Sequence, residues 1–358
     1  MKKVNLKAYC SINFGDDLFI EKITSRYKNV KFYLFINPKF NKPFKKIKNL
    51  YTPSIVSYYM FRVLDKLKIT DILNGRILFF KNIFNVSVKI GGSIFIETKN
   101  MKYNARETSY LFSDYIIGAN FGPYKTQRFY EYVFNQLKGV SDCCFRDQYS
   151  YNLFSKLNNV RYAPDVLFSY NKLPSLKSGK GIGISVIKLE NREQLSDYTK
   201  IYYDTLAQIC FLAEKDDIPV TLFSFCEYEG DMEAINKILQ LLNNKKNVSI
   251  VSYKGDMKKF LEQLNEVEYL LASRFHAMIL GWVLEKKVFP IIYSNKHLNV
   301  INDIGCQCCF WNILEGEKYN SNTLYTDLLS TNIININDVR KNAENQFHEL
   351  DKILKDKK

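Results

Sequence analysis

Residues 269–281 read YLLASRFHAMILG, which is an apolar run, a polar break and a second apolar run. The first run has the length of a buried strand that ends at Ser273, and the second favours a helix that begins near Ala277. A strand that leads directly into a helix is the repeating unit of a parallel α/β sheet. The stretch therefore predicts an α/β fold, with Arg274 and His276 between a strand end and a helix start.

The same alternation continues on both sides of this stretch. In the first half we expect strands at residues 31–36, 77–80, 86–90, 115–118, 142–145 and 160–163, and helices at 18–25, 57–68, 128–138 and 147–157. In the second half we expect strands at 181–187, 219–225, 248–251, 269–273 and 288–293, and helices at 198–215, 231–242, 257–264 and 277–286. Residues 339–354 favour one more helix.

One stretch without periodicity divides the chain. Residues 169–180 read SYNKLPSLKSGK, and this Pro-, Ser-, Gly- and Lys-rich composition predicts a linker. We therefore expect a Rossmann-like domain at 1–168, a second one at 181–335 and a C-terminal helix at 336–358. Two such domains would face each other across a cleft, and ligands of such sheets bind beyond the carboxyl ends of the strands.

Composition excludes several classes of protein. The 358 residues are 46% hydrophobic, which excludes a disordered chain. No apolar run reaches the ~18 residues of a membrane-spanning helix, and no apolar segment follows the basic start as in a signal peptide. The net charge is 51 − 37 = +14, but the basic residues are scattered, so no nucleic-acid site is predicted. We interpret the charge as a composition bias, with an anionic substrate or an anionic membrane surface as alternatives.

The eight cysteines include the cluster CQCC at residues 306–309. No second CxxC or HxH pair completes four zinc ligands, so we predict no metal site. The cysteines lack paired spacings, and this favours a reducing cytoplasm.

Arg274 and His276 have the chemistry of a site for an anionic substrate. Free N–H groups and the dipole at a helix N-terminus favour an anion. Arginine offers a planar fork to carboxylate or phosphate, and histidine exchanges a proton near neutral pH. The alternative is that His276 caps the helix and Arg274 is a surface charge.

Small or polar residues follow several other strands. The sequences are NFGDD at 13–17, GGS at 91–93 and GANFGP at 118–123 in the first half, and GIGISVIK at 181–188 in the second. Each has a structural alternative, such as a helix cap at Asp16 or a turn at Gly92. None is a P-loop or a GxGxxG motif, so no nucleotide site is predicted. Residues 227–231, EYEGD, look like an acidic metal motif, but we interpret Asp231 as a helix N-cap.

Taken in order, these pieces resemble the polysaccharide pyruvyl transferase family. The similarity spans residues 4–305 and comprises NFGDD at Asn13, GGS at Gly91, GANFGP at Gly118, FRD at Phe145, APDVLF at Ala163, GIGIS at Gly181, SRFHA at Ser273 and the strand exit from Tyr293 to Lys296. The resemblance implies a fold similar to that of GT-B glycosyltransferases. It also implies transfer of the enolpyruvyl unit of phosphoenolpyruvate onto a sugar as a pyruvate ketal.

The resemblance assigns roles to particular residues. Arg274 and His276 would serve donor binding and proton transfer, and the expected donor-binding residues are Ser185, Lys188, Ser273, Arg274 and Lys296. Lys188 stands where family members often have arginine, with Arg192 behind it. For the acceptor we expect the short polar groups of Asn13, Asp16, Asp17, Gly92 and Asn120. We expect no metal and no cofactor, with phosphoenolpyruvate as donor substrate.

Two other functions stay open at this point: a GT-B glycosyltransferase that uses a nucleotide sugar, and a non-catalytic sugar-binding relative. For the transferase, the expected partners are phosphoenolpyruvate and a sugar or lipid-linked oligosaccharide of capsule, lipopolysaccharide or exopolysaccharide synthesis, and no nucleic acid. We expect a cytoplasmic location, with peripheral contact at the inner face of the cytoplasmic membrane as a further alternative.

Overall fold

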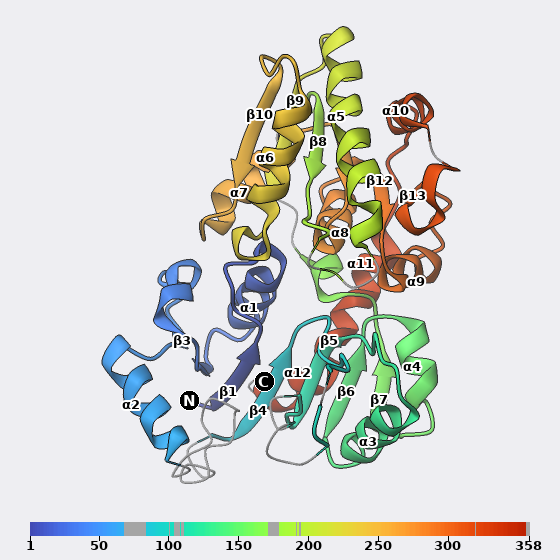
Figure 1. Cartoon of the computed structure of the whole chain (residues 1–358). Coiled ribbons are helices and arrows are strands. Elements are labelled where there is room, and N and C mark those ends of the chain that lie inside the picture. Colours follow the sequence, from blue (N-terminus) through green and yellow to red (C-terminus); the bar gives the residue numbers. More distant parts are fainter. Residues whose placement is uncertain are drawn as a thin grey trace. The chain divides into compact units, whose positions relative to one another are not determined.

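The computed structural model describes residues 1–67, 84–99, 101–103, 108, 111–170, 179–190, 192, 195–318 and 320–355. They form two compact units (Figure 1). Unit 1 comprises Met1–Cys10, Asp16–Ser169 and Asp338–Lys358, and unit 2 comprises Ser11–Gly15 and Tyr170–Asn337. The strand expected at 77–80 and residues 171–178 of the expected linker lie outside the described residues.

Unit 1 contains a parallel sheet whose strands lie in the order β3-β2-β1-β4-β5-β6-β7. The strands are β1 (Lys3–Ala8), β2 (Lys31–Leu34), β3 (Leu50–Tyr51), β4 (Val86–Ile90), β5 (Tyr115–Ala119), β6 (Asp142–Phe145) and β7 (Val160–Tyr162). Val4 of β1 pairs with Phe32 on one side and with Val86 on the other. The strand order therefore reverses between β1 and β4, as in a Rossmann fold.

In the described part of unit 1, the α-helices before the C-terminal segment are α1 (Phe14–Arg26), α2 (Ile55–Lys66), α3 (Gln127–Leu137) and α4 (Gln148–Phe154). Thr126 and Asp147 cap α3 and α4 with their side-chain oxygens. Buried aromatic rings such as Phe129 and Phe154 join these two helices to one face of the sheet.

The C-terminal segment of unit 1 differs from the single helix expected at 339–354. It consists of α11 (Asn337–Ala343), a 3-10 turn (Glu344–Phe347) and α12 (His348–Leu354). The turn directs the buried Gln346 into unit 1, where its amide accepts from the N–H of Gly118 and donates to the carbonyls of Ala163 and Pro164. The helix breaks because this side chain satisfies buried main-chain groups at the strand ends.

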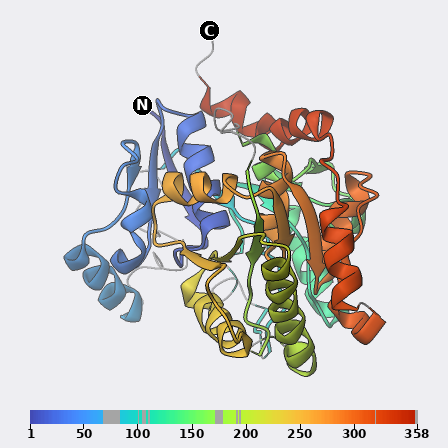
Figure 2. The same cartoon turned by 90° about the horizontal axis from the view of Figure 1, so that it is seen from above.

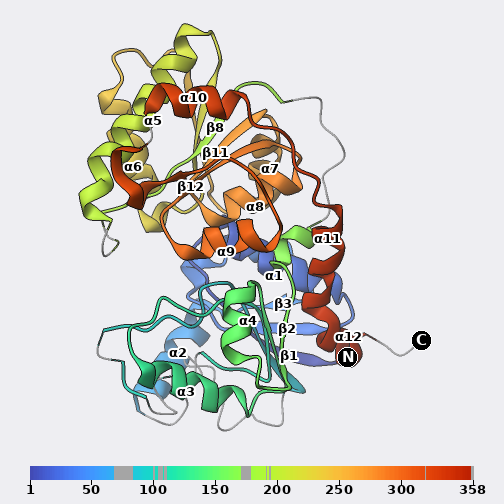
Figure 3. The same cartoon turned by 90° about the vertical axis from the view of Figure 1, so that its right-hand side faces the viewer.

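Charged contacts hold α12 beside α1 (Figure 3). Arg26 donates to both carboxylate oxygens of Asp351, at 2.8 and 2.6 Å, and also pairs with Glu344. Tyr27 donates its hydroxyl to Asp351 at 2.7 Å. The last helix is therefore a fixed part of unit 1.

Unit 2 repeats the same topology, with the strand order β10-β9-β8-β11-β12-β13. The strands are β8 (Ile182–Ser185), β9 (Val220–Ser224), β10 (Val248–Ser252), β11 (Tyr269–Ala272), β12 (Lys287–Ile292) and β13 (Trp311–Asn312). All neighbours are parallel, and the order reverses between β8 and β11. This reversal is the place where such sheets bind ligands.

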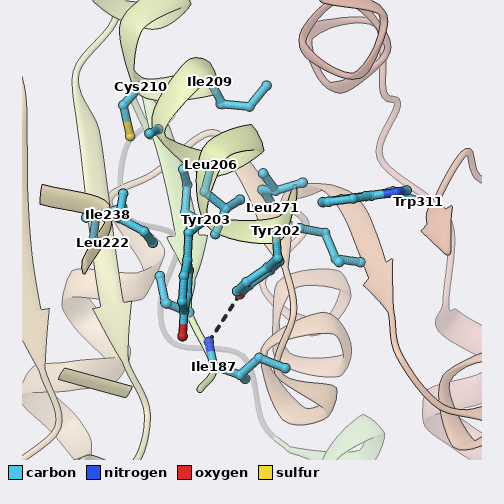
Figure 4. Packing of buried hydrophobic residues seen from close by; sticks show 14 of the residues in the cluster. Ile187, Tyr202, Tyr203, Leu206, Ile209, Cys210, Leu222, Ile238, Leu271 and Trp311 are labelled. Atoms are coloured by element: carbon cyan, nitrogen blue, oxygen red, sulfur yellow. Dashed lines mark hydrogen bonds between the residues drawn. The ribbon is translucent and has the colours of Figure 1, made fainter. Parts of the chain in front are cut away.

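Helices cover both faces of the sheet of unit 2. They are α5 (Thr199–Lys215), α6 (Asp231–Leu241), α7 (Met257–Asn265), α8 (Phe275–Val283), α9 (Asn295–Asp303) and α10 (Ser321–Leu329). Leu271 packs with Tyr202 and Trp311 on one face (Figure 4). Its neighbour Leu270 lies on the other face and packs against α8. The approach is close, since a Cβ on Gly281 of α8 would lie 2.7 Å from the Leu270 side chain. Figure 2 shows α5 and α6, in olive and yellow, on the side of the sheet away from α7, in orange.

The predicted fold class is confirmed, since two parallel sheets with Rossmann strand orders make up the α/β fold. The strands expected at 86–90 and 142–145 have the expected bounds, whereas α8 begins at Phe275, two residues earlier than expected. Within the described ranges, no helix is long and apolar enough to cross a membrane. The eight cysteines, all of them in described positions, are free thiols.

Candidate active site

The candidate site lies in unit 2, where β8 and β11 end side by side. The Ser185 hydroxyl accepts from the N–H of Arg274 at 3.0 Å. Tyr202 donates its hydroxyl to Ser273 at 2.8 Å and accepts from the N–H of Ile187 at 3.2 Å (Figure 4). These hydroxyls are buried, so the two serines hold the main chain before α8 in place.

The side chain of Arg274 is held by two carboxylates. It makes a bidentate pair with Asp231, with Nε 3.1 Å from Oδ2, and its third nitrogen pairs with Glu229. Asp231 also accepts from the N–H groups of Phe225 and Cys226 at 2.9 Å each. The expectation that Asp231 caps α6 is wrong, because Gly230 occupies the cap and the carboxylate turns toward Arg274.

Burial and charge act in opposite directions on the two carboxylates. Burial raises the pKa of Asp231, and the charge of Arg274 opposes it only in part. Burial raises the pKa of Glu229 as well, but the charges of Arg274 and Arg192 and hydrogen bonds from Arg274 and Asn13 hold it below its ordinary value. Glu229 is therefore an anion at neutral pH, and Asp231 depends on Arg274 for its charge.

Two further cations gather beside Arg274, around the ring of Tyr293 at the end of β12. The guanidinium of Arg192 lies 5.1 Å from the ring centroid and 3.6 Å from a Glu229 oxygen. Lys296, on α9, has its Nζ 5.6 Å from the same centroid. Burial raises the pKa of Tyr293, but the charges of Lys296, Arg192 and Arg274 together bring it below its ordinary value. The site thus holds three cations against two carboxylates.

Lys188 is directed to a different partner. Its ammonium group pairs with Glu233 on α6, whereas Arg192 pairs with Glu229. Of the two basic residues that follow β8, Arg192 is thus the one beside the carboxylate partner of Arg274.

His276 lies in the first turn of α8, half-buried, with its ring 5.3 Å from that of Phe275. The segment Ser11–Gly15, which belongs to unit 2, packs against it. A Cβ on Gly15 would lie 1.8 Å from Nδ1 of His276, so only glycine fits there. Asn13 donates to Glu229 at 3.0 Å. Asn13, which was predicted for the acceptor, therefore lies in the same unit as Arg274 and His276.

The other predicted acceptor residues lie in unit 1. Asn120 accepts from the buried Arg146 at 2.6 Å, and Arg146 also pairs with the buried Asp165 at 2.9 Å. Gly92 packs against the same guanidinium, since a Cβ there would lie 2.2 Å from it. Asp16 and Asp17 are in the first turn of α1, where the helix dipole favours carboxylates. The predicted site residues thus divide between unit 1 and unit 2.

Sequence reasoning missed Glu229 and Tyr293 and gave Arg192 only a secondary place. The acidic run at 227–231 was the available signal for Glu229, but its partner is 45 residues away in sequence. Among the described residues, no three His, Cys, Asp or Glu side chains are grouped as metal ligands would be.

Known structures share the fold of the chain at low sequence identity. The UDP-GlcNAc 2-epimerase of Methanocaldococcus jannaschii, in complex with UDP-GlcNAc and UDP, superposes with a TM-score of 0.58 at 12% identity, covering 97% of this chain and 99% of that one. The UDP-GlcNAc 2-epimerase of Neisseria meningitidis gives 0.53 at 12%, covering 98% and 100%. HepE of Anabaena, in complex with UDP and glucose, gives 0.52 at 12%, covering 99% of each chain. These likenesses show a GT-B type of fold.

A search of curated proteins finds no match. The family model described as polysaccharide pyruvyl transferase matches residues 13–295, which is more than half of the chain. The matched range begins at Asn13 and includes Arg274 and His276. The chain belongs to the polysaccharide pyruvyl transferase family.

Proposed function

We propose that this protein transfers the enolpyruvyl unit of phosphoenolpyruvate onto a sugar of a surface polysaccharide or its precursor, forming a pyruvate ketal. One observation carries the proposal: Arg192, Arg274 and Lys296 gather around Glu229 and Tyr293 at the strand reversal of unit 2, and His276 follows Arg274 by two residues. Phosphoenolpyruvate has a carboxylate and a phosphate, and both groups need cations and N–H donors.

The cations have different roles in this proposal. Arg274 is fixed by Asp231 and Glu229, so it presents a rigid guanidinium at the start of α8. Arg192 and Lys296 lie on ring faces rather than in bidentate pairs, and they contact the carboxylate and phosphate of the donor. Ser185 and Ser273 act indirectly, because their hydroxyls fix the main chain that carries Arg274.

His276 supplies the proton that starts the reaction. The imidazolium protonates the methylene carbon of the donor, and a sugar hydroxyl attacks the adjacent carbon and loses its proton. The proton of this first hydroxyl returns to His276. A second hydroxyl then forms the other C–O bond as the bond to phosphate breaks, its proton passes to the departing phosphate oxygen, and inorganic phosphate leaves. The cations stabilise the negative charge on that phosphate.

Donor binding and product formation test the proposal separately. Thermal unfolding is followed with phosphoenolpyruvate and with a panel of nucleotide sugars, since a true donor stabilises the protein by RT ln(1 + [L]/Kd). We expect stabilisation by phosphoenolpyruvate, and release of phosphate with a ketal-bearing product when acceptor glycans are added. Stabilisation by a nucleotide sugar and none by phosphoenolpyruvate would refute the proposal in favour of a glycosyltransferase.

A further inference from the structure

Helix α2 of unit 1 carries an apolar stripe on its exposed side. The stripe consists of side chains that are 51–79% exposed, namely Ile55, Val56, Tyr59, Met60, Val63 and Leu67. Successive residues of a helix turn by about 100°, so these six fall within an arc of about 140°. Scattered apolar residues are normal on a protein surface, whereas six on one helix face form a patch.

The opposite side of α2 faces the protein. Phe61 packs its ring against that of Phe35 at 5.7 Å, and Ser57, Tyr58 and Leu64 are partly buried. The helix is therefore apolar on the face that packs against unit 1 and on the face that is exposed. Packing within unit 1 explains only the first of these faces.

Basic residues lie on α2 and in the turns that precede it in sequence. Residues 38–67 contain seven Lys and Arg and one Asp, so they contribute 7 − 1 = +6 of the net charge of +14. All seven basic residues are exposed, and they are Lys39, Lys42, Lys45, Lys46, Lys48, Arg62 and Lys66. Five of these six net charges come from the turns at 38–48, and α2 itself contributes one.

We infer that α2 docks unit 1 on an anionic phospholipid bilayer, with its apolar stripe among the acyl chains and the basic residues between 39 and 66 on the headgroups. A helix with an apolar stripe and basic flanks lies in the plane of the bilayer interface. Tyr59 and the exposed Tyr51 suit the interfacial layer. Lys66 falls inside the arc of the stripe, about 20° from Ile55, and its long stem lets its charge reach the headgroups.

Charge decides between a bilayer and a second copy of the chain. Two copies that met through α2 would each bring the +6 of residues 38–67, and like charges repel each other. An anionic lipid surface attracts the same basic residues. Each basic residue near the surface raises the affinity for the bilayer about fivefold. The inference goes beyond the proposed function and is independent of donor and acceptor.

Co-sedimentation of the full chain with vesicles tests it, without any substrate. The vesicles contain equal amounts of phosphatidylcholine and phosphatidylglycerol, or phosphatidylcholine alone. We expect binding to the anionic vesicles that weakens with salt, and at least about tenfold weaker binding for Met60→Asp/Val63→Asp. Lys45→Ser/Lys46→Ser should lose about 25-fold on anionic vesicles.

The matched control is Leu241→Asp/Ile250→Asp, which places the same charges on exposed apolar residues of unit 2. This control should bind like the wild type, and circular dichroism should show that all variants are folded. Absence of wild-type binding, or equal loss in the control, would overturn the inference. So would a concentration-dependent dimer in sedimentation analysis that Met60→Asp/Val63→Asp abolishes, since that outcome identifies a second copy as the occupant.

Discussion

Replacement of Arg274 by alanine should destabilise unit 2 as well as weaken donor binding. The guanidinium is the main charge partner of Asp231, whose side chain is fully buried. Removal of one partner of a buried ion pair costs about 3–5 kcal/mol, because the other charge is left without compensation. Two main-chain N–H groups still contact Asp231, so we expect about 3 kcal/mol, the lower end of that range.

The loss should depend on pH in a defined direction. Burial raises the pKa of Asp231 even in the presence of Arg274, and without Arg274 the pKa must rise further. A carboxyl whose pKa is higher in the folded state binds its proton more tightly there, so protonation stabilises the fold. The difference between wild type and Arg274→Ala should therefore be larger at alkaline pH and shrink as the pH falls and Asp231 takes up its proton.

Tryptophan fluorescence isolates the relevant transition. The two tryptophans of the chain, Trp282 and Trp311, are both buried in unit 2. With a urea m-value of about 2 kcal/mol/M for a unit of this size, a loss of about 3 kcal/mol lowers the midpoint by about 1.5 M. Circular dichroism of the whole chain shows whether unit 1 is unaffected.

A double-mutant cycle gives the decisive control. Arg274→Ala/Asp231→Ala removes both charges, so it should be more stable than the sum of the two single losses by about 1–3 kcal/mol. A loss in Arg274→Ala that is below about 1 kcal/mol, or that is equal at both ends of the pH range, would refute the argument that Arg274 compensates a buried Asp231 charge.

Three other predictions follow from the same structure. His276→Gln should keep donor binding and lower turnover by about 10²–10⁴-fold. Gly15→Ala, which displaces the His276 ring, should lower turnover by about 10²-fold. Normal turnover in either variant would contradict the role of His276 in proton transfer. Arg192→Ala should raise the donor Kd by at least about tenfold, whereas the control Lys188→Ala should change it little. Calorimetry that shows the reverse order would assign donor binding to Lys188 instead of Arg192. Burial raises the pKa of Asp351, but hydrogen bonds from basic partners lower it overall to about 2, from an ordinary 3.8. The ionised Asp351 therefore stabilises the folded state above about pH 4, and this stabilisation is lost as the pH falls toward about 2. Asp351→Asn should remove this acid-sensitive part of the stability, which is read from acid unfolding by circular dichroism; an unchanged acid midpoint would count against the ion pair with α1.

Much of the fold was predictable because the strands and helices have local signatures. The strands of both sheets are short apolar runs, and Val86–Ile90 and Asp142–Phe145 appear with the expected bounds. The C-terminal helix was not predicted correctly, because its interruption depends on Gln346. That side chain bonds to Gly118 and Ala163, which are 228 and 183 residues away. Helical periodicity contains no information about such distant partners.

Site residues could be predicted where they stand directly between one strand and the helix that follows it. They could not be predicted where packing brings together segments that are distant in sequence. Arg274 and His276 follow β11 directly, so their position at a strand end could be derived from residues 269–281. Glu229 comes from the segment before α6, and nothing in its neighbourhood indicates an arginine partner from another strand. Lys188 is nearer to β8 than Arg192, and only the structure shows that it turns to Glu233 instead.

The positions of Asn13 and Gly15 show that the order of motifs along the sequence does not tell which unit a residue contacts. A role therefore cannot be assigned from that order alone. The segment Ser11–Gly15 follows β1 of unit 1 in sequence, yet its contacts are with unit 2. Asn13 bonds to the carboxylate that also pairs with Arg274, and Gly15 leaves the space that the His276 ring fills. A change at either residue therefore acts first on the position of His276 and of Arg274. It follows that loss of activity on mutation of Asn13 is no sign of acceptor binding unless the donor Kd stays unchanged in the same variant.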